Sequence, residues 1–404
     1  MARPWLALAL ALALVGCNPT AARPAPDAAP VPAASASAAP VAAPFPASTL
    51  PLFRRFPALA DKLAVLPIGV FPTPVERAER LGDRVGIPRL YLKRDDLSDP
   101  TCGGSKTRKL AFLLGDAVRK GSKKVITFGG VGSNHALATA LFGKRAGLDV
   151  MLMLAPELPS DHVRDHLLIE RGLGAELVFM PSVTEARARA DRRVRASAPT
   201  DRPYVIPPGG SSPLGNLGYV NAAFELKEQI DQGLMPEPDV LYLAMGTMGS
   251  AVGLAIGLRA AGMKTRLVPV RASSTDAASE GKMVELFDAT IGLLRSMDPS
   301  FPALTLKRED TGIRHGYVGQ GYARPTRKGL DAMRVFREAT GIELETTYTA
   351  KAFAAVTDDA GALRDQVVLF WSTQNRLGTD LPRANEQELP AGFQPFLRQE
   401  PGRP

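Results

Sequence analysis

Residues 124–140 read KVITFGGVGSNHALATA, and this stretch contains the repeating unit from which the fold can be inferred. An apolar run of strand length ends in a glycine-rich turn, and a helical pattern begins at Ser133. A strand with apolar residues on both faces is typical of a parallel sheet covered by helices. In such sheets, ligands bind where strands end and helices begin. The stretch therefore predicts an α/β fold and a position for its binding site.

The same unit recurs along most of the chain. Further strands are predicted at 89–95, 149–155, 175–181, 239–246, 265–270 and 366–372. Helices are predicted between most of them, one of which begins at Asn216. This alternation favours parallel sheets, and 404 residues with 45% hydrophobic content are enough for a sizeable core. The net charge of +8 is spread along the chain, so no nucleic-acid partner is expected.

The N-terminus has the pattern of an export signal. An apolar run from Trp5 to Val15 follows Arg3 and is too short to span a bilayer. Residues 14–17, Leu-Val-Gly-Cys, resemble a bacterial lipobox, which implies cleavage of a signal peptide at 1–16 and lipidation of Cys17. The alternative is an ordinary signal peptide with a chance cysteine. We expect an exported protein that its N-terminal lipid anchors to the membrane of the cell envelope, on the periplasmic or surface side.

A low-complexity segment follows the lipobox. Residues 18–48 contain 13 Ala and 8 Pro, a composition that cannot bury a core. Together with Cys17 they are predicted to form a tether at 17–48. The only other cysteine is Cys102, so no disulfide is expected in the mature chain.

Residues 103–112, GGSKTRKLAF, place Lys106, Arg108 and Lys109 at the start of a predicted helix. Ser105 is predicted to be the N-cap. The helix dipole opposes a cation in the first turn and Arg108 acts in the same direction, so the neutral amine of Lys106 is favoured. Schiff-base chemistry needs such an amine. The alternatives are a phosphate-binding loop, although the P-loop spacing is not met, or lysines that face solvent.

Three further glycine-rich turns precede predicted helices. The turn at 246–250, GTMGS, offers backbone N–H groups and two hydroxyls at a helix N-terminus, which suits a phosphate. Its G-x-x-G spacing differs from the dinucleotide fingerprint, which argues against an NADP-binding protein. The turn before Ser133, Asn134 and His135 suits a carboxylate, and residues 207–220 contain the last such turn. No metal site is expected.

With FPTPVERAERLG, LYLKRDDL, YVGQGYARPT and TTYTAKAF, these segments resemble one family over about residues 65–372. It is the D-cysteine desulfhydrase and 1-aminocyclopropane-1-carboxylate deaminase family of pyridoxal-phosphate enzymes. The resemblance implies a two-domain tryptophan-synthase-β-like α/β fold (fold type II) and a homodimer. The larger, cofactor-binding domain would comprise 49–108 and 216–380, the smaller domain 109–215, and a C-terminal tail 381–404.

The resemblance also implies roles for individual residues. Lys106 would be the Schiff-base lysine that holds pyridoxal 5'-phosphate, and Lys109 a structural neighbour. Asn134 would bond the pyridoxal hydroxyl, and a small amino-acid substrate would place its carboxylate at Ser133, Asn134 and His135. Ser133, Tyr322 and Tyr348 would join Lys106 in catalysis. The cofactor phosphate would lie at Gly246, Thr247, Met248, Gly249 and Ser250.

Thr349 favours one of the two family activities. In the family the residue after the second tyrosine contacts the pyridine nitrogen, and it is Glu in the deaminases and Thr in the desulfhydrases. A hydroxyl cannot keep that nitrogen charged, but a weaker electron sink suffices for α,β-elimination. We therefore expect a pyridoxal-phosphate-dependent lyase acting on a D-cysteine-like amino acid.

Two alternatives remain open at this point: a racemase or β-replacement enzyme of the same fold, and a catalytically silent surface binding protein. Two positions depart from the family. Residues 371–375 read WSTQN where the family has a His-Thr-Gly-Gly-like run, and Met248 is bulky for a phosphate turn.

Overall fold

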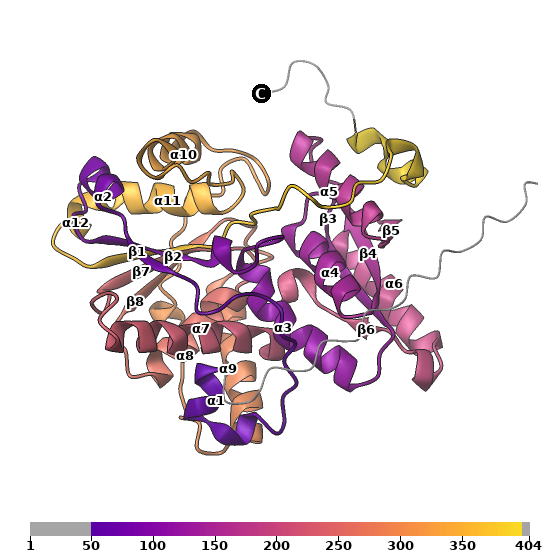
Figure 1. Cartoon of the computed structure of the whole chain (residues 1–404), viewed down its shortest axis with the longest axis horizontal. Helices are drawn as coiled ribbons and strands as arrows, with labels where there is room; N and C mark the ends of the chain where they lie inside the picture. The colour runs from indigo at the N-terminus through magenta and orange to yellow at the C-terminus, as the bar shows by residue number, and fades with distance from the viewer. Residues whose placement is uncertain (1–49, 398–404) are drawn as a thin grey trace, which may run out of the picture. The chain divides into compact units, whose positions relative to one another are not determined.

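The computed structural model describes residues 50–397, which contain two β-sheets (Figure 1). The expected lipidation site at Cys17 lies outside these residues. The larger sheet has the order β1-β2-β9-β7-β8, in which only the pairing of β1 with β2 is antiparallel. Its strands are β1 (Val75–Arg77), β2 (Leu90–Arg94), β9 (Val368–Ser372), β7 (Val240–Met245) and β8 (Arg266–Arg271).

The smaller sheet is parallel throughout and has the order β5-β4-β3-β6. Its strands are β5 (Glu176–Phe179), β4 (Asp149–Ala155), β3 (Lys124–Gly130) and β6 (Tyr204–Val205). The seven predicted strands are confirmed, whereas the short β1 and β6 were not predicted. The strands of the two sheets fall into the residue ranges expected for the two domains, but the domain boundaries themselves stay predictions.

Helices cover both sheets, because each sheet is apolar on both faces. On the larger sheet, one hydrophobic cluster includes α2 (Glu79–Val85), α10 (Arg327–Thr340) and α11 (Thr349–Asp358). A second cluster includes α7 (Pro213–Asp231), α8 (Gly249–Ala260) and α9 (Glu280–Met297). On the smaller sheet, α6 (Val183–Ala196) packs on β3 and β4 in a cluster separate from that of α4 (Asn134–Arg145) and α5 (Asp161–Gly172). Two short α-helices of the described residues are α1 (Pro51–Arg55) and α12 (Ala360–Leu363). Residues 50–397 also contain seven short 3-10 helices, one of which is Glu386–Glu388.

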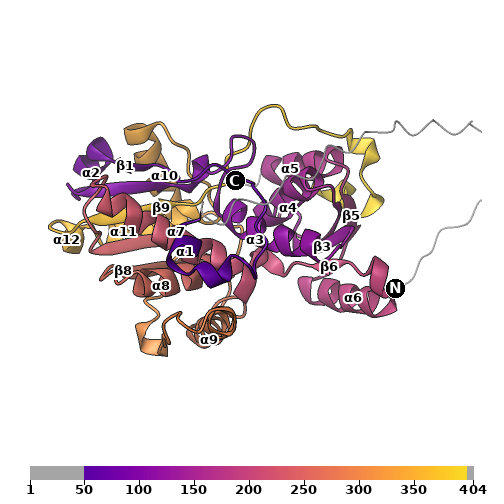
Figure 2. The same ribbon diagram turned by 60° about the horizontal axis from the view of Figure 1, so that its bottom comes forward.

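The helix α3 (Ser105–Arg119) connects the two halves of this arrangement. It contacts α7 beside the larger sheet and α4 beside the smaller one, and Figures 1 and 2 both show it between them. The first turn of α3 carries the cation-rich stretch. It lies where the carboxyl ends of strands from both sheets converge.

The starts of three helices test the capping residues and helix bounds predicted from the sequence. Ser133 is the N-cap of α4 and accepts a hydrogen bond from Ala136 N, as its position in the sequence predicts. The helix predicted from Asn216 begins earlier, at Pro213, because Ser212 caps it and proline suits the first helical position. The prediction of Ser105 as an N-cap is wrong: Gly104 occupies that position, and Ser105 is the first helical residue.

A buried ion network lies between α3, β2 and α7. Arg108 forms ion pairs of 2.8 Å with both Asp95 and Glu225, and Lys93 lies 2.5 Å from Glu225. All four side chains are at most 3% exposed. The positive charge of Arg108 is therefore compensated by two carboxylates. Contrary to the expectation from the sequence, Arg108 is not among the causes that lower the pKa of Lys106.

Residues 381–397, which the sequence analysis set apart as a tail, pack against the smaller sheet. Arg383 forms an ion pair with Asp165 of α5, and the rings of Phe393 and Phe396 lie 5.7 and 5.9 Å from that of Phe179 on β5. Among the described residues, every helix is too short or too polar to cross a membrane.

Candidate active site

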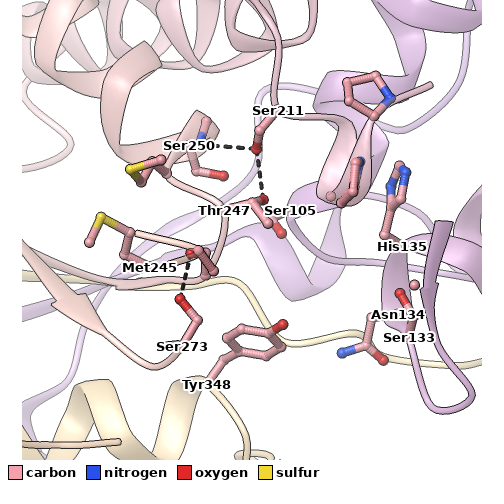
Figure 3. A pocket seen from close by; sticks show the side chains of 18 of the residues that line it. Ser105, Ser133, Asn134, His135, Ser211, Met245, Thr247, Ser250, Ser273 and Tyr348 are labelled. Atoms are coloured by element: carbon pink, nitrogen blue, oxygen red, sulfur yellow. Dashed lines mark hydrogen bonds between the residues drawn. The ribbon is translucent and has the colours of Figure 1, made fainter. Parts of the chain in front are cut away.

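A cavity of about 910 Å³ opens where strands of both sheets end (Figure 3). Its wall comes from the N-termini of α3, α4 and α8, from the loop before α7, and from the segments that carry Tyr322 and Tyr348. This volume is at the upper end of the range for small-molecule sites, so a cofactor and a small substrate fit together. Most residues predicted for the site line this cavity: Lys106, Ser133, Asn134, His135, residues 246–250, Tyr322 and Tyr348. Thr349 does not line it.

Lys106 lies in the first turn of α3, and its Nζ donates a hydrogen bond of 2.8 Å to Ser105 Oγ. Burial lowers the pKa of Lys106 to about 8, against the opposing effects of Glu345 and Cys102. The lowered pKa agrees with the expectation from the sequence, but burial rather than Arg108 is its main cause. A substantial share of the amine is therefore neutral near physiological pH, as a nucleophilic lysine requires.

The turn at 246–250 forms a cradle with side chains that the sequence analysis did not select. Ser211 Oγ accepts a hydrogen bond from Gly249 N at 3.1 Å and lies 2.7 Å from Thr247 Oγ1. Lys109 Nζ donates to Ser211 Oγ at 3.1 Å, and a Cβ on Gly249 would lie only 2.7 Å from this nitrogen. Met248 adopts the left-handed conformation in this turn, with φ of +66°, and its side chain packs into the core.

The electrostatics of this cradle favour an anion. Burial, and then Lys106, lower the pKa of Lys109 well below its usual range. Lys109 forms no ion pair with a carboxylate among the described residues. A phosphate bound here would favour the protonated form of Lys109 and would meet the N-terminus of α8, so the residues present fit the phosphate of a cofactor. Lys109 is thus a cavity residue rather than the structural neighbour that was expected.

The start of α4 faces the cavity on the opposite side. Ser133 caps the helix, Asn134 and His135 occupy its first turn, and all three line the cavity (Figure 3). His135 Nε2 lies 2.9 Å from Thr127 Oγ1, and burial, followed by Lys106 and Lys109, lowers its pKa well below the usual range. His135 is therefore neutral, so backbone N–H groups of α4, rather than an imidazolium, can bind a substrate carboxylate.

Two tyrosines complete the wall. The hydroxyls of Tyr322 and Tyr348 lie 2.7 Å apart, and a Cβ on Gly246 would approach the Tyr348 ring to 2.8 Å. Thr349 is fully buried, and its hydroxyl accepts a hydrogen bond from Glu345 N at 3.0 Å. The expected contact of Thr349 with the cofactor ring therefore stays a prediction. Glu345, which does line the cavity, was missed.

Residues 66–373 match the family described as "Pyridoxal-phosphate dependent enzyme". The chain belongs to the pyridoxal-phosphate-dependent enzymes. Its relatives include the D-cysteine desulfhydrases of Salmonella newport and Salmonella typhimurium, each 33% identical over 314 residues, or 75% of this chain and 91% of the relative. The resemblance to the D-cysteine desulfhydrase and 1-aminocyclopropane-1-carboxylate deaminase family, and pyridoxal phosphate as the cofactor, are confirmed.

Solved structures confirm the expected tryptophan-synthase-β-like fold type. An ACC deaminase homologue aligns with a TM-score of 0.66 at 29% identity, covering 80% of this chain and 95% of the other. Threonine deaminase isoform 2 of Solanum lycopersicum shares the fold alone, with a TM-score of 0.52 at 18% identity over 81% of this chain and 83% of the other. Among the residues present, Lys106 would hold the pyridoxal phosphate covalently, and the cradle of Lys109, Thr247 and Gly249 would bind its phosphate.

Replacement of Lys109 by Met should weaken binding of pyridoxal phosphate about ten- to hundredfold, because a charge-assisted hydrogen bond to the phosphate contributes about 1.5–3 kcal/mol. Titration of the purified protein with the cofactor, followed by absorbance, measures the change. Lys144→Met removes an exposed lysine from α4 and should leave the affinity unchanged. Equal affinities of Lys109→Met and the unaltered chain would remove Lys109 from the phosphate site.

Proposed function

We propose that the protein is a pyridoxal-phosphate-dependent lyase that catalyses α,β-elimination from a small amino acid of the D-cysteine type. The Cα–H and Cβ–S bonds break, sulfide leaves, and water hydrolyses the resulting imine, so the products are a 2-oxo acid, ammonia and sulfide. The observation that carries the proposal is the convergence of Lys106 with the α4 N-terminus and two tyrosines around one cavity. The names and 33% identity of the desulfhydrase relatives support the substrate type.

The geometry suggests a division of labour among the residues. When bound, pyridoxal phosphate supplies an electron sink for the reacting amino acid. Lys106 Nζ, with its pKa lowered to about 8, would take the proton from Cα. The N-terminus of α4 would hold the substrate carboxylate. The paired hydroxyls of Tyr322 and Tyr348 would hold a proton at the side of the leaving group, and Ser133 would be a further proton carrier.

An assay of the cofactor-loaded full chain tests this activity. D-cysteine, L-cysteine and 1-aminocyclopropane-1-carboxylate would be supplied separately, with sulfide and 2-oxo acid measured as products. Sulfide and pyruvate in equal amounts from D-cysteine are expected. Conversion between the cysteine enantiomers without release of sulfide would instead establish a racemase, and no turnover by cofactor-loaded protein would contradict the lyase proposal.

We also propose that the protein is anchored to the cell envelope through Cys17 and that it is a homodimer. The lipobox-like residues before Cys17 support the anchor, and the resemblance to the family supports the dimer. Cys17→Ser should move the protein from the membrane fraction to the soluble fraction of cells. Light scattering on the purified protein measures its oligomeric state, and a monomeric mass would contradict the dimer.

A further inference from the structure

Three polar side chains form a row between the two sheets beside the cavity. Cys102 Sγ, from the loop before α3, lies 3.2 Å from Asn375 Oδ1, and Asn375 Nδ2 lies 3.3 Å from Asn134 Oδ1 at the start of α4. Asn375 lies in the segment after β9. Its two partners, Cys102 and Asn134, are 273 and 241 positions away in the sequence. Asn375 and Asn134 both line the cavity.

The hydrogen bonds of the row run in one direction, from Cys102 through Asn375 to Asn134. Burial, followed by the charge of Asp99, raises the pKa of Cys102 to about 12, so the thiol keeps its proton and donates. Asn375 accepts this hydrogen bond through its carbonyl oxygen and donates through its amide nitrogen to Asn134 Oδ1. Asn134 accepts through Oδ1, which leaves its Nδ2 as the atom available to the cavity. Within residues 50–397, Asn134 Nδ2 has no protein acceptor.

The backbone around Asn375 is held on both sides. Gly103 N donates to Arg376 O at 2.9 Å, and Gly378 N donates to Thr101 O at 2.8 Å. Gly104 has φ of +117°, and a Cβ there would lie 2.6 Å from Gln374 O, so only glycine permits this close approach. The side chain of Asn375 therefore projects from a backbone that is fixed against the start of α3.

We propose that Asn375 is a positioning residue that fixes the side-chain amide of Asn134 so that its N–H donors face the cavity. The ligand group would be an oxygen acceptor, and the ring hydroxyl oxygen of pyridoxal phosphate is the one that Asn134 is expected to bind. The inference rests on the proposed function for its ligand. It gives a role to the WSTQN segment, whose last residue, Asn375, bridges the loop before α3 and the start of α4.

Two substitutions at Asn375 test the role. Asn375→Asp keeps the shape and the acceptor for Cys102 but cannot donate to Asn134, whose amide would turn and direct its oxygen into the cavity. Asn375→Leu removes the donor without adding charge. Both variants of the full chain should bind pyridoxal phosphate about ten- to hundredfold more weakly than the unaltered chain in absorbance titrations, since a buried acceptor would lose its donor. The pH midpoint of the bound cofactor's absorbance should also rise, because the donor stabilises the ionised ring oxygen.

A double-substitution cycle with Asn134→Ala separates this role from a general structural one. If Asn375 acts through Asn134, Asn375→Asp should cause little further loss of affinity in the Asn134→Ala background. Equal losses in both backgrounds, or unchanged affinity of both Asn375 variants, would overturn the inference. Where a variant at 375 fails to fold by circular dichroism, Cys102→Ala replaces it, since loss of the thiol donor frees the Asn375 amide to turn and should weaken binding in the same direction. Failure of the unaltered chain to bind the cofactor would contradict the proposed function instead.

Discussion

Replacement of Lys106 by Ala is expected to abolish turnover, with kcat lowered by about 10²–10⁴-fold from loss of the proton carrier alone. Covalent attachment of the cofactor should be lost as well, because the two other lysines that line the cavity within residues 50–397 are already bonded. Lys109 donates to Ser211 and the backbone of Gly209, and Lys282 donates to the backbone of Asp276. The measurements are product release from D-cysteine and mass spectrometry after borohydride reduction. A modified peptide containing Lys106 should appear in the unaltered chain and be absent from the variant.

Lys106→Arg is the matched control for charge and size. Arginine keeps the cation but is not deprotonated in proteins, so it should be as inactive as alanine. Added small primary amines should restore part of the activity of Lys106→Ala and none of that of Lys106→Arg, because only the former leaves space for a neutral amine. Reduction that labels another lysine in the unaltered chain would refute the assignment of Lys106.

Replacement of Arg108 by Met is expected to have the largest effect on stability. The change would leave Asp95 and Glu225 buried, with Lys93 as the one remaining cation of the network. Breaking a buried ion pair by removing one partner costs about 3–5 kcal/mol, because the other charge stays buried without compensation. Urea denaturation followed by circular dichroism would measure the loss of unfolding free energy.

Arg84→Met provides the control, since Arg84 and Glu338 form an ion pair with side chains 59% and 48% exposed. Such exposed pairs contribute about 0–1 kcal/mol. The double variant Arg108→Met, Asp95→Asn should recover part of the lost stability, because Glu225 still pairs with Lys93 and no uncompensated carboxylate remains. A loss for Arg108→Met no larger than that for Arg84→Met would show that the network does not stabilise the fold.

The same network predicts a pH dependence. Burial alone would raise the pKa of Glu225, but Arg108 and Lys93 outweigh it and lower that pKa to about 2. A carboxyl whose pKa is lower in the folded state stabilises the fold above its unfolded pKa, near 4.3, and loses that contribution as the pH falls towards 2. The unaltered chain should therefore lose stability between about pH 5 and 2. The Arg108→Met variant should show a weaker dependence in this window.

The parallel strands could be predicted from the sequence because apolar runs such as 124–130 and 149–155 mark buried strands on their own, and the structure has both with the predicted bounds. The short β1 and β6 could not, since two or three residues carry no periodic signal. Ser105 was read as a cap on residue type alone, whereas the backbone at Gly104, with φ of +117°, decides where α3 begins.

The site could be predicted only in part. Lys106, Asn134 and the 246–250 turn lie in segments whose glycine-rich patterns are local, and all line the cavity. Ser211 and Asn375 enter it through tertiary contacts with residues that are distant in the sequence, which no local pattern reveals. The main cause of the lowered pKa of Lys106 could not be predicted from the sequence either, because the burial of a side chain depends on the assembled fold.

The position of β9 sets an order of events during synthesis. β9 lies between β2 and β7 in the larger sheet, yet its residues 368–372 form the last strand in sequence order among the described residues. The smaller sheet uses one continuous stretch from β3 to β6, so all its strands leave the ribosome more than 160 residues earlier, at residue 205 against residue 368. Domains generally fold as units, N-terminal first, during synthesis. The nascent chain thus carries the larger sheet as two separate parts, with unpaired edges on β2 and β7, until β9 has been synthesised.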